Sequence, residues 1–197
     1  MMLNSFYSYG MALREIGLPE VEYPSGALLP WAMLSWMSGN SREAFALLFP
    51  MLNIACDMLI VAALLWLLRA ARSSAHAPST VLAAAPAGLY AFAPLLEPFV
   101  FAKYDSLPAA LALGGLALFA ARRPGLAGAA LGLGATIKWT PLLAAPLLAL
   151  HLIRERNWRE LVLFTAGLLV SAAATSLPFA LTNPAAFLLA IPASDRT

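Results

Sequence analysis

The sequence predicts an all-α protein, a multi-pass bundle of transmembrane helices, and three observations support this class. Of its 197 residues, 61% are hydrophobic and 11% are charged, whereas charged residues make up about 25% of an average soluble domain. No Asp, Glu, Lys or Arg occurs between Arg72 and Glu97 or between Glu160 and Asp195, and apolar stretches of about 18 residues or more indicate membrane helices. These stretches lack the alternation of apolar and polar residues that barrel strands would show.

The first apolar element covers residues 27–38, and at about 12 residues it is too short to cross a hydrocarbon core of about 30 Å. Trp31 and Trp36 suit a membrane–water interface, so an interfacial helix is predicted. About six membrane segments follow, at residues 43–68, 80–97, 106–121, 125–137, 141–153 and 161–181. The chain is therefore expected to divide into an outer loop with the interfacial helix (1–40), a transmembrane bundle (41–182) and a truncated outer loop (183–197).

Arginines between these segments determine the predicted topology. Seven of the twelve basic residues lie in three short loops: Arg69, Arg72, Arg122, Arg123, Arg154, Arg156 and Arg159. The positive-inside rule places these loops in the cytoplasm. Most acidic residues lie at the opposite ends of the segments, so the N-terminal loop and the 97–105 loop are expected outside.

The segment between Arg123 and Arg154 contains two predicted helices of about 13 residues, which reach only about 20 Å at 1.5 Å per residue. Lys138, Trp139 and Pro141 lie in the turn between them. Short paired helices that end in a charge can build a site at membrane depth. We therefore expect the pair at 125–153 to place Lys138 in a thinned or water-filled region. The alternative is a tilted pair whose Lys138 snorkels to the outer surface.

Two further features of the predicted spans are interpreted as packing devices. The glycine-rich run 125–134 contains a GxxxG pattern, and small residues let membrane helices approach closely. Asn53 and Asp57 lie one turn apart inside the first span. Because polar groups are costly at membrane depth, we interpret them as a pair that forms hydrogen bonds between helices.

Composition excludes several functions. The net charge of +2 is small and spread over loops, so no nucleic-acid partner is expected. The single cysteine, Cys56, leaves no internal disulfide and no cysteine metal cluster, and no metal or cofactor is expected. His76 and His151 have no acidic partner at a spacing that would suit a Ser-His-Asp arrangement.

Ionisable and aromatic residues gather instead on the predicted outer side: Glu22, Tyr23, Glu97, Lys103, Tyr104, Asp105, Lys138 and Trp139. Carboxylates accept protons from sugar hydroxyl groups, a lysine balances phosphate charge, and aromatic rings stack on sugar faces. Together these residues predict an outward cavity for a sugar and a phosphate. For Lys103 and Asp105 a solvated pair at a loop end is the alternative.

Five stretches occur in an ordered series: Glu22-Tyr-Pro-Ser-Gly-Ala-Leu28, Lys103-Tyr-Asp-Ser-Leu-Pro-Ala109, Arg122–Gly132, Ile137-Lys-Trp-Thr-Pro-Leu142 and Asn183–Leu188. Over about residues 5–190, their order and spacing resemble those of polyprenyl-phosphate-dependent glycosyltransferases with the GT-C fold. The resemblance is closest to glycosyltransferase family 87, a mannosyltransferase-like group.

The resemblance implies an integral membrane glycosyltransferase with a partial GT-C-like fold in the bacterial cytoplasmic membrane. Such an enzyme transfers a sugar of the mannose type, with inversion, from a polyprenyl-phosphate donor to an acceptor on the outer face. It implies Lys138 as the ligand of the donor phosphate. The implied substrate-binding residues are Glu22, Tyr23, Lys103, Asp105 and Trp139. The implied partners are the polyprenyl-phosphate sugar and the lipid bilayer.

The sequence departs from the family pattern near its start. The resemblance calls for a catalytic Asp near Met2 or Leu3, preceded by a membrane span, and neither is found at those positions. Ser25 replaces the second proline of the first motif. The chain is therefore expected to be part of a larger enzyme and not to catalyse transfer alone. A transporter-like protein and a non-catalytic membrane protein are the alternatives, and a transporter would need more polar groups at mid-membrane than Asn53 and Asp57.

Overall fold

The computed structural model describes residues 7–8, 10–11, 25–39, 41–71, 88–90, 105–182 and 184, and every regular element in these residues is helical. The elements are η1 (Ser25–Ala27), α2 (Leu28–Met37), α3 (Arg42–Ala71), α5 (Ser106–Ala120), α6 (Pro124–Ile137), η3 (Thr140–Ala144), α7 (Ala145–Arg154) and α8 (Trp158–Thr182). The predicted all-α class is confirmed, and these helices lie close to the predicted ranges. Of the predicted segment 80–97, only residues 88–90 are described.

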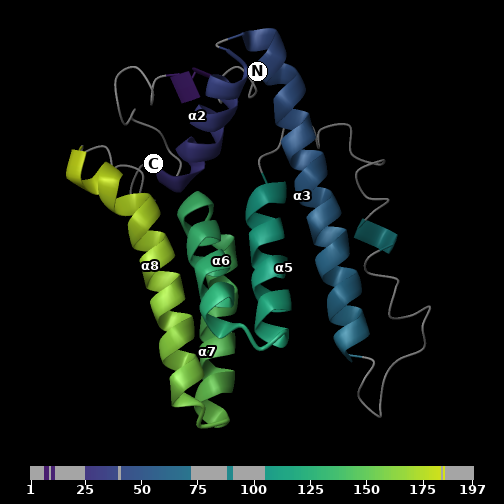
Figure 1. Cartoon of the computed structure of the whole chain (residues 1–197), viewed down its shortest axis with the longest axis vertical. Coiled ribbons are helices and arrows are strands. Elements are labelled where there is room, and N and C mark those ends of the chain that lie inside the picture. Colours follow the sequence, from purple (N-terminus) through teal and green to yellow (C-terminus); the bar gives the residue numbers. More distant parts are fainter. Residues whose placement is uncertain are drawn as a thin grey trace, which may run out of the picture.

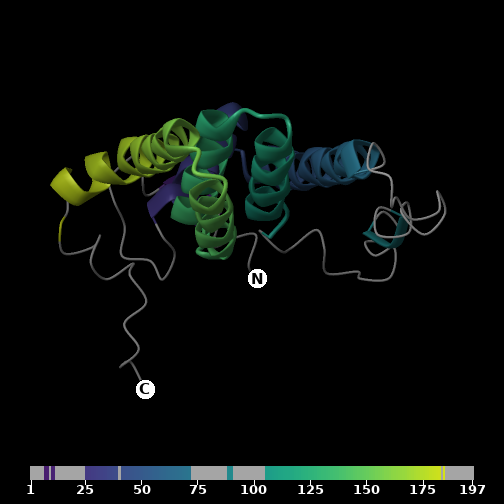
Figure 2. The ribbon, with the colours of Figure 1, turned by 90° about the horizontal axis from the view of Figure 1, so that it is seen from below.

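The helices from α5 onward run alternately down and up, with α3 beside α5 and α2 across the upper end (Figure 1). Seen from below, α8, α6, α5 and α3 form a row, and α7 lies on one side of it (Figure 2). Because η3 and α7 return the chain to the lower end, α6 and α8 are parallel neighbours. Ile137 at the end of α6 and Arg123 before its start therefore lie at opposite ends of the bundle.

Glycines permit the closest contact in the bundle, between α6 and α8. Gly128 and Gly132 lie directly on the α8 backbone at Phe164 and Leu168. In return, Gly167 of α8 lies on the carbonyl group of Gly125. A Cβ atom at Gly128 would overlap the carbonyl oxygen of Phe164, so only glycine allows this approach. The packing role predicted for the glycine-rich run is confirmed.

Helix lengths separate the elements into two groups. With 30 and 25 residues, α3 and α8 are about 45 and 38 Å long, whereas α5 and α6, with 15 and 14 residues, reach only about 22 Å at 1.5 Å per residue. Only α3 and α8 among the described helices are long and apolar enough to cross a bilayer. The count of about six membrane segments therefore stays a prediction.

Burial distinguishes these two long helices from the core helices of a soluble protein. Each long helix contains an apolar stretch of 18 residues, and 22% of this stretch is buried in α3 and 6% in α8. Outward-facing side chains such as Val162, Leu169 and Val170 remain exposed. A soluble protein buries its most apolar helices, so these faces are suited to contact with lipid.

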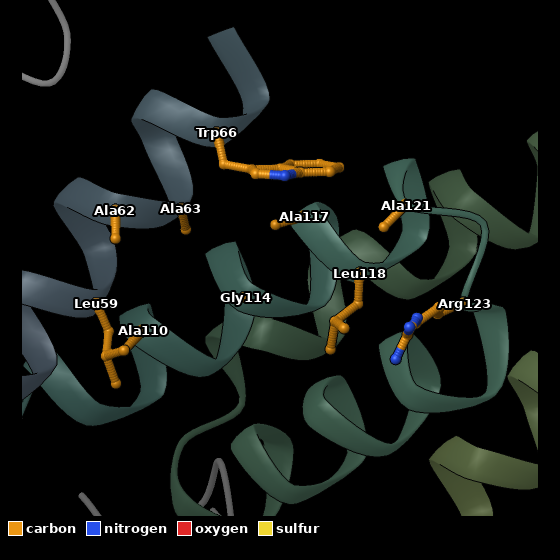
Figure 3. A pocket seen from close by; sticks show the side chains of 10 residues that line it. All are labelled: Leu59, Ala62, Ala63, Trp66, Ala110, Gly114, Ala117, Leu118, Ala121 and Arg123. Carbon is orange, nitrogen blue, oxygen red and sulfur yellow. The ribbon is translucent and has the colours of Figure 1, made fainter. Parts of the chain in front are cut away.

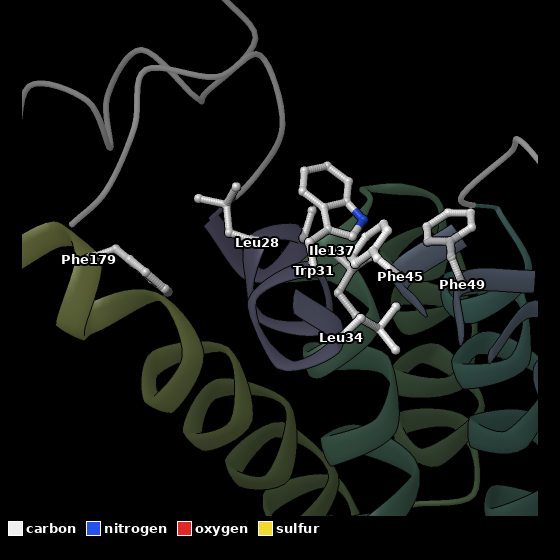
Figure 4. Close-up of a cluster of buried hydrophobic side chains, with 8 residues drawn as sticks. Leu28, Trp31, Leu34, Phe45, Phe49, Ile137 and Phe179 are labelled. Atoms are coloured by element: carbon white, nitrogen blue, oxygen red, sulfur yellow. The ribbon is translucent and has the colours of Figure 1, made fainter. Parts of the chain in front are cut away.

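The segment predicted as an interfacial helix forms η1 and α2, and Trp31 is buried in the protein. Its side chain is 0% exposed and packs in a cluster with Phe45 and Phe49 of α3 and Ile137 of α6 (Figure 4). Leu28, Trp31 and Leu34 share the buried face of α2, whereas Trp36 is exposed. The amphipathic ring of a tryptophan suits a protein core as well as a lipid headgroup region, so Trp31 is a core residue here and the interfacial position of the helix stays a prediction.

Alanine substitutions at two glycines test the α6–α8 contact. Gly128→Ala forces a Cβ onto the α8 backbone and should lower the free energy of unfolding by about 1–3 kcal/mol, the usual cost of overpacking. Gly114→Ala is the matched control because a Cβ there meets no heavy atom within 4 Å. It should be neutral or stabilising by up to about 1 kcal/mol. Thermal unfolding in detergent measures both, and equal shifts would contradict the packing role.

Candidate functional site

The turn after α6 holds the motif that contains Lys138 and Trp139. Pro141 has no backbone N–H to donate to the carbonyl group of Ile137, so the α-helix cannot continue through it. Lys138 adopts an extended backbone at the end of α6, with φ −154° and ψ 140°. The chain then reverses through η3, which includes the buried Pro141. Lys138 and Trp139 thus form the tip of a hairpin of short helices.

An ion pair joins this tip to the start of α5. The Lys138 ammonium group donates to Oδ1 of Asp105, although the two residues are 33 positions apart. Asp105 is the residue that precedes the first turn of α5. Two sequence motifs therefore meet at one place, as their assignment to a common outward cavity requires.

Exposure determines what this ion pair contributes. The side chains of Lys138 and Asp105 are 48% and 61% exposed, and an exposed pair stabilises a fold by only about 0.2–1 kcal/mol. The pair can therefore exchange for contacts with a ligand at small cost to the fold. The indole ring of Trp139, next in sequence, is exposed as well.

A third motif reaches the same place through Gly26. A Cβ atom at Gly26 would overlap the Thr136 hydroxyl group and lie 2.6 Å from the Thr136 carbonyl oxygen. The end of the Glu22–Leu28 motif therefore packs on the last turn of α6, two residues before Lys138. Of the sequence-predicted site residues, the structure brings Asp105, Lys138 and Trp139 together. Glu22, Tyr23 and Lys103 lie outside the described residues.

The hairpin tip is not an outer edge of the protein. Ile137, next to Lys138, is buried beneath α2. The hydroxyl groups of Thr136 and Thr175 are hydrogen-bonded at 3.1 Å, and α8 continues from Thr175 to Thr182, about 10 Å further at 1.5 Å per residue. Structure therefore surrounds the tip on the α2 and α8 sides while the Lys138 side chain is 48% exposed, and the depth of Lys138 in a membrane stays a prediction.

A second polar contact lies beside α3. The Tyr90 hydroxyl group donates to Oδ1 of Asp57 at 2.7 Å, and the Ser106 side chain interacts with the same hydroxyl. Asp57 therefore forms a hydrogen bond with another segment, as expected, and Asn53 is buried one turn away. Sequence reasoning missed Tyr90, because a single tyrosine in an uncharged stretch does not indicate a hydrogen-bond partner.

No group of three His, Cys, Asp or Glu side chains within the described segments could hold a metal ion.

The described helices expose apolar faces, and apart from Asp57 in the middle of α3 their charged groups lie at the two ends, which defines a membrane-associated helical protein. The family model of glycosyltransferase family 87 matches residues 22–196, and the chain belongs to this family. The match begins at Glu22, the first residue of the first motif. Searches of curated proteins found no match. Solved structures gave none either.

A double-mutant cycle measures the ion pair. Asp105→Asn, Lys138→Met and the double variant should reveal a coupling below about 1 kcal/mol, because both side chains are more than a third exposed. Thermal unfolding in detergent gives the difference in the free energy of unfolding between the wild type and each of the three variants. A larger coupling would mean that the pair holds the fold together and is not available to a ligand.

The Tyr90–Asp57 bond is expected to matter more to the fold. Tyr90→Phe removes the donor and should lower the free energy of unfolding by about 0.6–2 kcal/mol, the range for hydrogen bonds within membrane proteins. Asp57→Asn is the milder control because it keeps an acceptor oxygen. If both variants unfold at the wild-type temperature, the bond does not tie this segment to α3.

Proposed function

We propose that this chain forms the donor site of a membrane glycosyltransferase, and that the tip of the α6–η3 hairpin binds a polyprenyl-phosphate-linked sugar. The observation that carries the proposal is the ion pair between Lys138 and Asp105. It joins a cation suited to phosphate with a carboxylate suited to sugar hydroxyl groups. Family membership supports sugar transfer over the transporter and scaffold alternatives.

Lys138 is proposed to bind the donor phosphate. In an inverting transfer, an acceptor oxygen bonds to the anomeric carbon while the bond from that carbon to the phosphate oxygen breaks. The acceptor proton passes to a carboxylate base, and the polyprenyl phosphate leaves with the bonding electron pair. A cation placed where this negative charge develops stabilises the transition state. An ammonium group has three donors, so Lys138 can bind a phosphate oxygen and keep Asp105 as its neighbour.

The other predicted residues are proposed to bind the sugars. Asp105 accepts from a sugar hydroxyl group and holds Lys138 in position, and the exposed Trp139 ring stacks on a sugar face. Glu22 and Tyr23 are included because Gly26, only four residues after Glu22, contacts the last turn of α6. Lys103 is included because it precedes Asp105 by two positions. The resemblance to a mannosyltransferase-like group leads us to propose a donor sugar of the mannose type.

Charge at the two ends of the bundle supports the proposed orientation. Six arginines lie in or beside the turns at the lower end, namely Arg69, Arg122, Arg123, Arg154, Arg156 and Arg159, against two glutamates, Glu155 and Glu160. Asp105 and Lys138 lie at the other end of α5 and α6. By the positive-inside rule, the donor site and the N-terminal loop face the outside of a bacterial cytoplasmic membrane that the chain crosses several times.

Donor binding tests the proposal apart from turnover. The full chain in phosphatidylcholine nanodiscs is titrated with polyprenyl monophosphate and with its mannosyl ester. Lys138→Ala should weaken binding of both lipids by about 10- to 100-fold, because hydrogen bonds to charged groups contribute about 1.5–3 kcal/mol. Lys138→Arg should retain most of the affinity.

Arg159→Ala is the matched control, since it removes one positive charge from the opposite end of the bundle. It should leave binding unchanged. Equal binding by wild type and Lys138→Ala would refute the phosphate role. If the phosphate binds and the mannosyl ester gains nothing from Trp139 or Asp105, the sugar assignment is wrong and the phosphate assignment stands.

A further inference from the structure

A second candidate binding site lies at the arginine end of the protein, between α3 and α5 (Figure 3). It is an open groove of about 570 Å³, and ten residues line it. Nine of them are apolar, including Leu59 and Trp66 of α3 and Ala110 of α5. The tenth is Arg123, in the turn before α6. The groove is thus a long apolar channel with one cation at its end.

Neighbouring glycines on α5 explain why the groove is empty of side chains. An added Cβ at Gly115 would meet Leu131 of α6 at 3.0 Å, so this glycine serves helix packing. An added Cβ at Gly114 meets nothing within 4 Å, and Gly114 lines the groove. Gly114 therefore leaves space that the described side chains do not fill.

The groove is long enough to hold an acyl chain over the depth of one leaflet of a bilayer. From Ala110 to Arg123 the helix and its turn span about 20 Å at 1.5 Å per residue. One leaflet is half of a hydrocarbon core of about 30 Å. An acyl chain that enters beside Arg123 would run along α5 for the full depth of its leaflet.

Charge at the end of the groove selects an anionic headgroup. The Arg123 side chain extends from its turn toward Leu118 (Figure 3), and no carboxylate in the described segments forms an ion pair with it. A guanidinium group binds phosphate oxygens in a bidentate manner. The N-terminus of α6 begins at Pro124, and helix N-termini favour phosphate groups.

We propose that this groove binds one anionic phospholipid, with its phosphate on Arg123 and an acyl chain between α3 and α5. The occupant is not the sugar donor of the proposed site, because Lys138 lies at the far end of the 14-residue α6, about 21 Å away along the helix. The lipid belongs to the leaflet at the arginine end, where positive charge attracts anionic headgroups. It completes the packing between α3 and the rest of the bundle.

Lipid retention by the full chain tests this inference. Protein purified in mild detergent is exchanged against phosphatidylglycerol and weighed intact by native mass spectrometry. Wild type should retain one phosphatidylglycerol. Arg123→Gln should lower its retention about tenfold or more, given about 1.5–3 kcal/mol for a charged hydrogen bond. Arg159→Gln removes the same charge from the same end and should retain the lipid.

Gly114→Leu places a side chain in the groove without a clash at its Cβ, so it should fold and lose the lipid. Unchanged circular dichroism and elution volume confirm folding. Equal retention by Arg123→Gln and Arg159→Gln would show non-specific attraction and overturn the proposal. Retention by Gly114→Leu, an absence of bound lipid in wild type, or a polyprenyl phosphate in place of phosphatidylglycerol would overturn it as well. Each result is independent of the Lys138 binding experiment.

Discussion

The backbone contact between α6 and α8 is the constraint on which the candidate site depends. Gly128, Gly132 and Gly167 let two parallel helices touch without side chains between them. Parallel neighbours need a return segment, and η3 with α7 supplies it. The hairpin tip with Lys138 therefore lies beside the upper part of α8 and not beyond it. The hydrogen bond between Thr136 and Thr175 fixes the same register just below the tip. A larger residue at Gly128 would move the tip as well as loosen the bundle.

The second constraint is electrostatic, and it divides the bundle into two ends of different chemistry. Arginines occupy the lower turns, and two of them, Arg122 and Arg156, adopt left-handed backbones with φ of 59° and 55°. Glycine is the usual residue at such helix ends, and a side chain there costs about 1 kcal/mol. Arginine at both positions keeps positive charge at this end despite that cost. The opposite end holds Asp105 and Lys138, together with Arg42 and Glu43 at the start of α3, so charges of both signs are mixed there.

Sequence reasoning succeeded where local physics decides the structure. Charged residues and prolines end helices, so the ranges around Arg122, Pro141 and Arg154 follow closely from the sequence. It failed where tertiary contacts decide. Tryptophan is typical of a membrane interface, but Trp31 is a core residue. Its burial depends on contacts with Phe45 and Ile137, which are distant in the sequence. The sequence assigned Asp105 and Lys138 to one cavity through topology and resemblance, but the contact between them depends on how α5 packs on α6. Tyr90 gave no usable signal for its bond to Asp57.

The distance between the two charged ends of α6 can be compared with the thickness of a bilayer. Arg123 and Lys138 flank the 14 residues of α6, so their charges are about 21 Å apart along the helix. Phosphates on opposite faces of a bilayer are separated by more than the hydrocarbon core of about 30 Å. If Arg123 binds a phosphate at its own membrane surface, a phosphate bound to Lys138 must lie about 10 Å below the opposite membrane surface. The donor headgroup would then lie below the level of the other headgroups in its leaflet when it reacts. Lys138 and Asp105 are 48% and 61% exposed without a ligand, and charged contacts gain strength as water leaves. A donor that covers both side chains would therefore strengthen the contact between the lysine and the leaving phosphate as it binds.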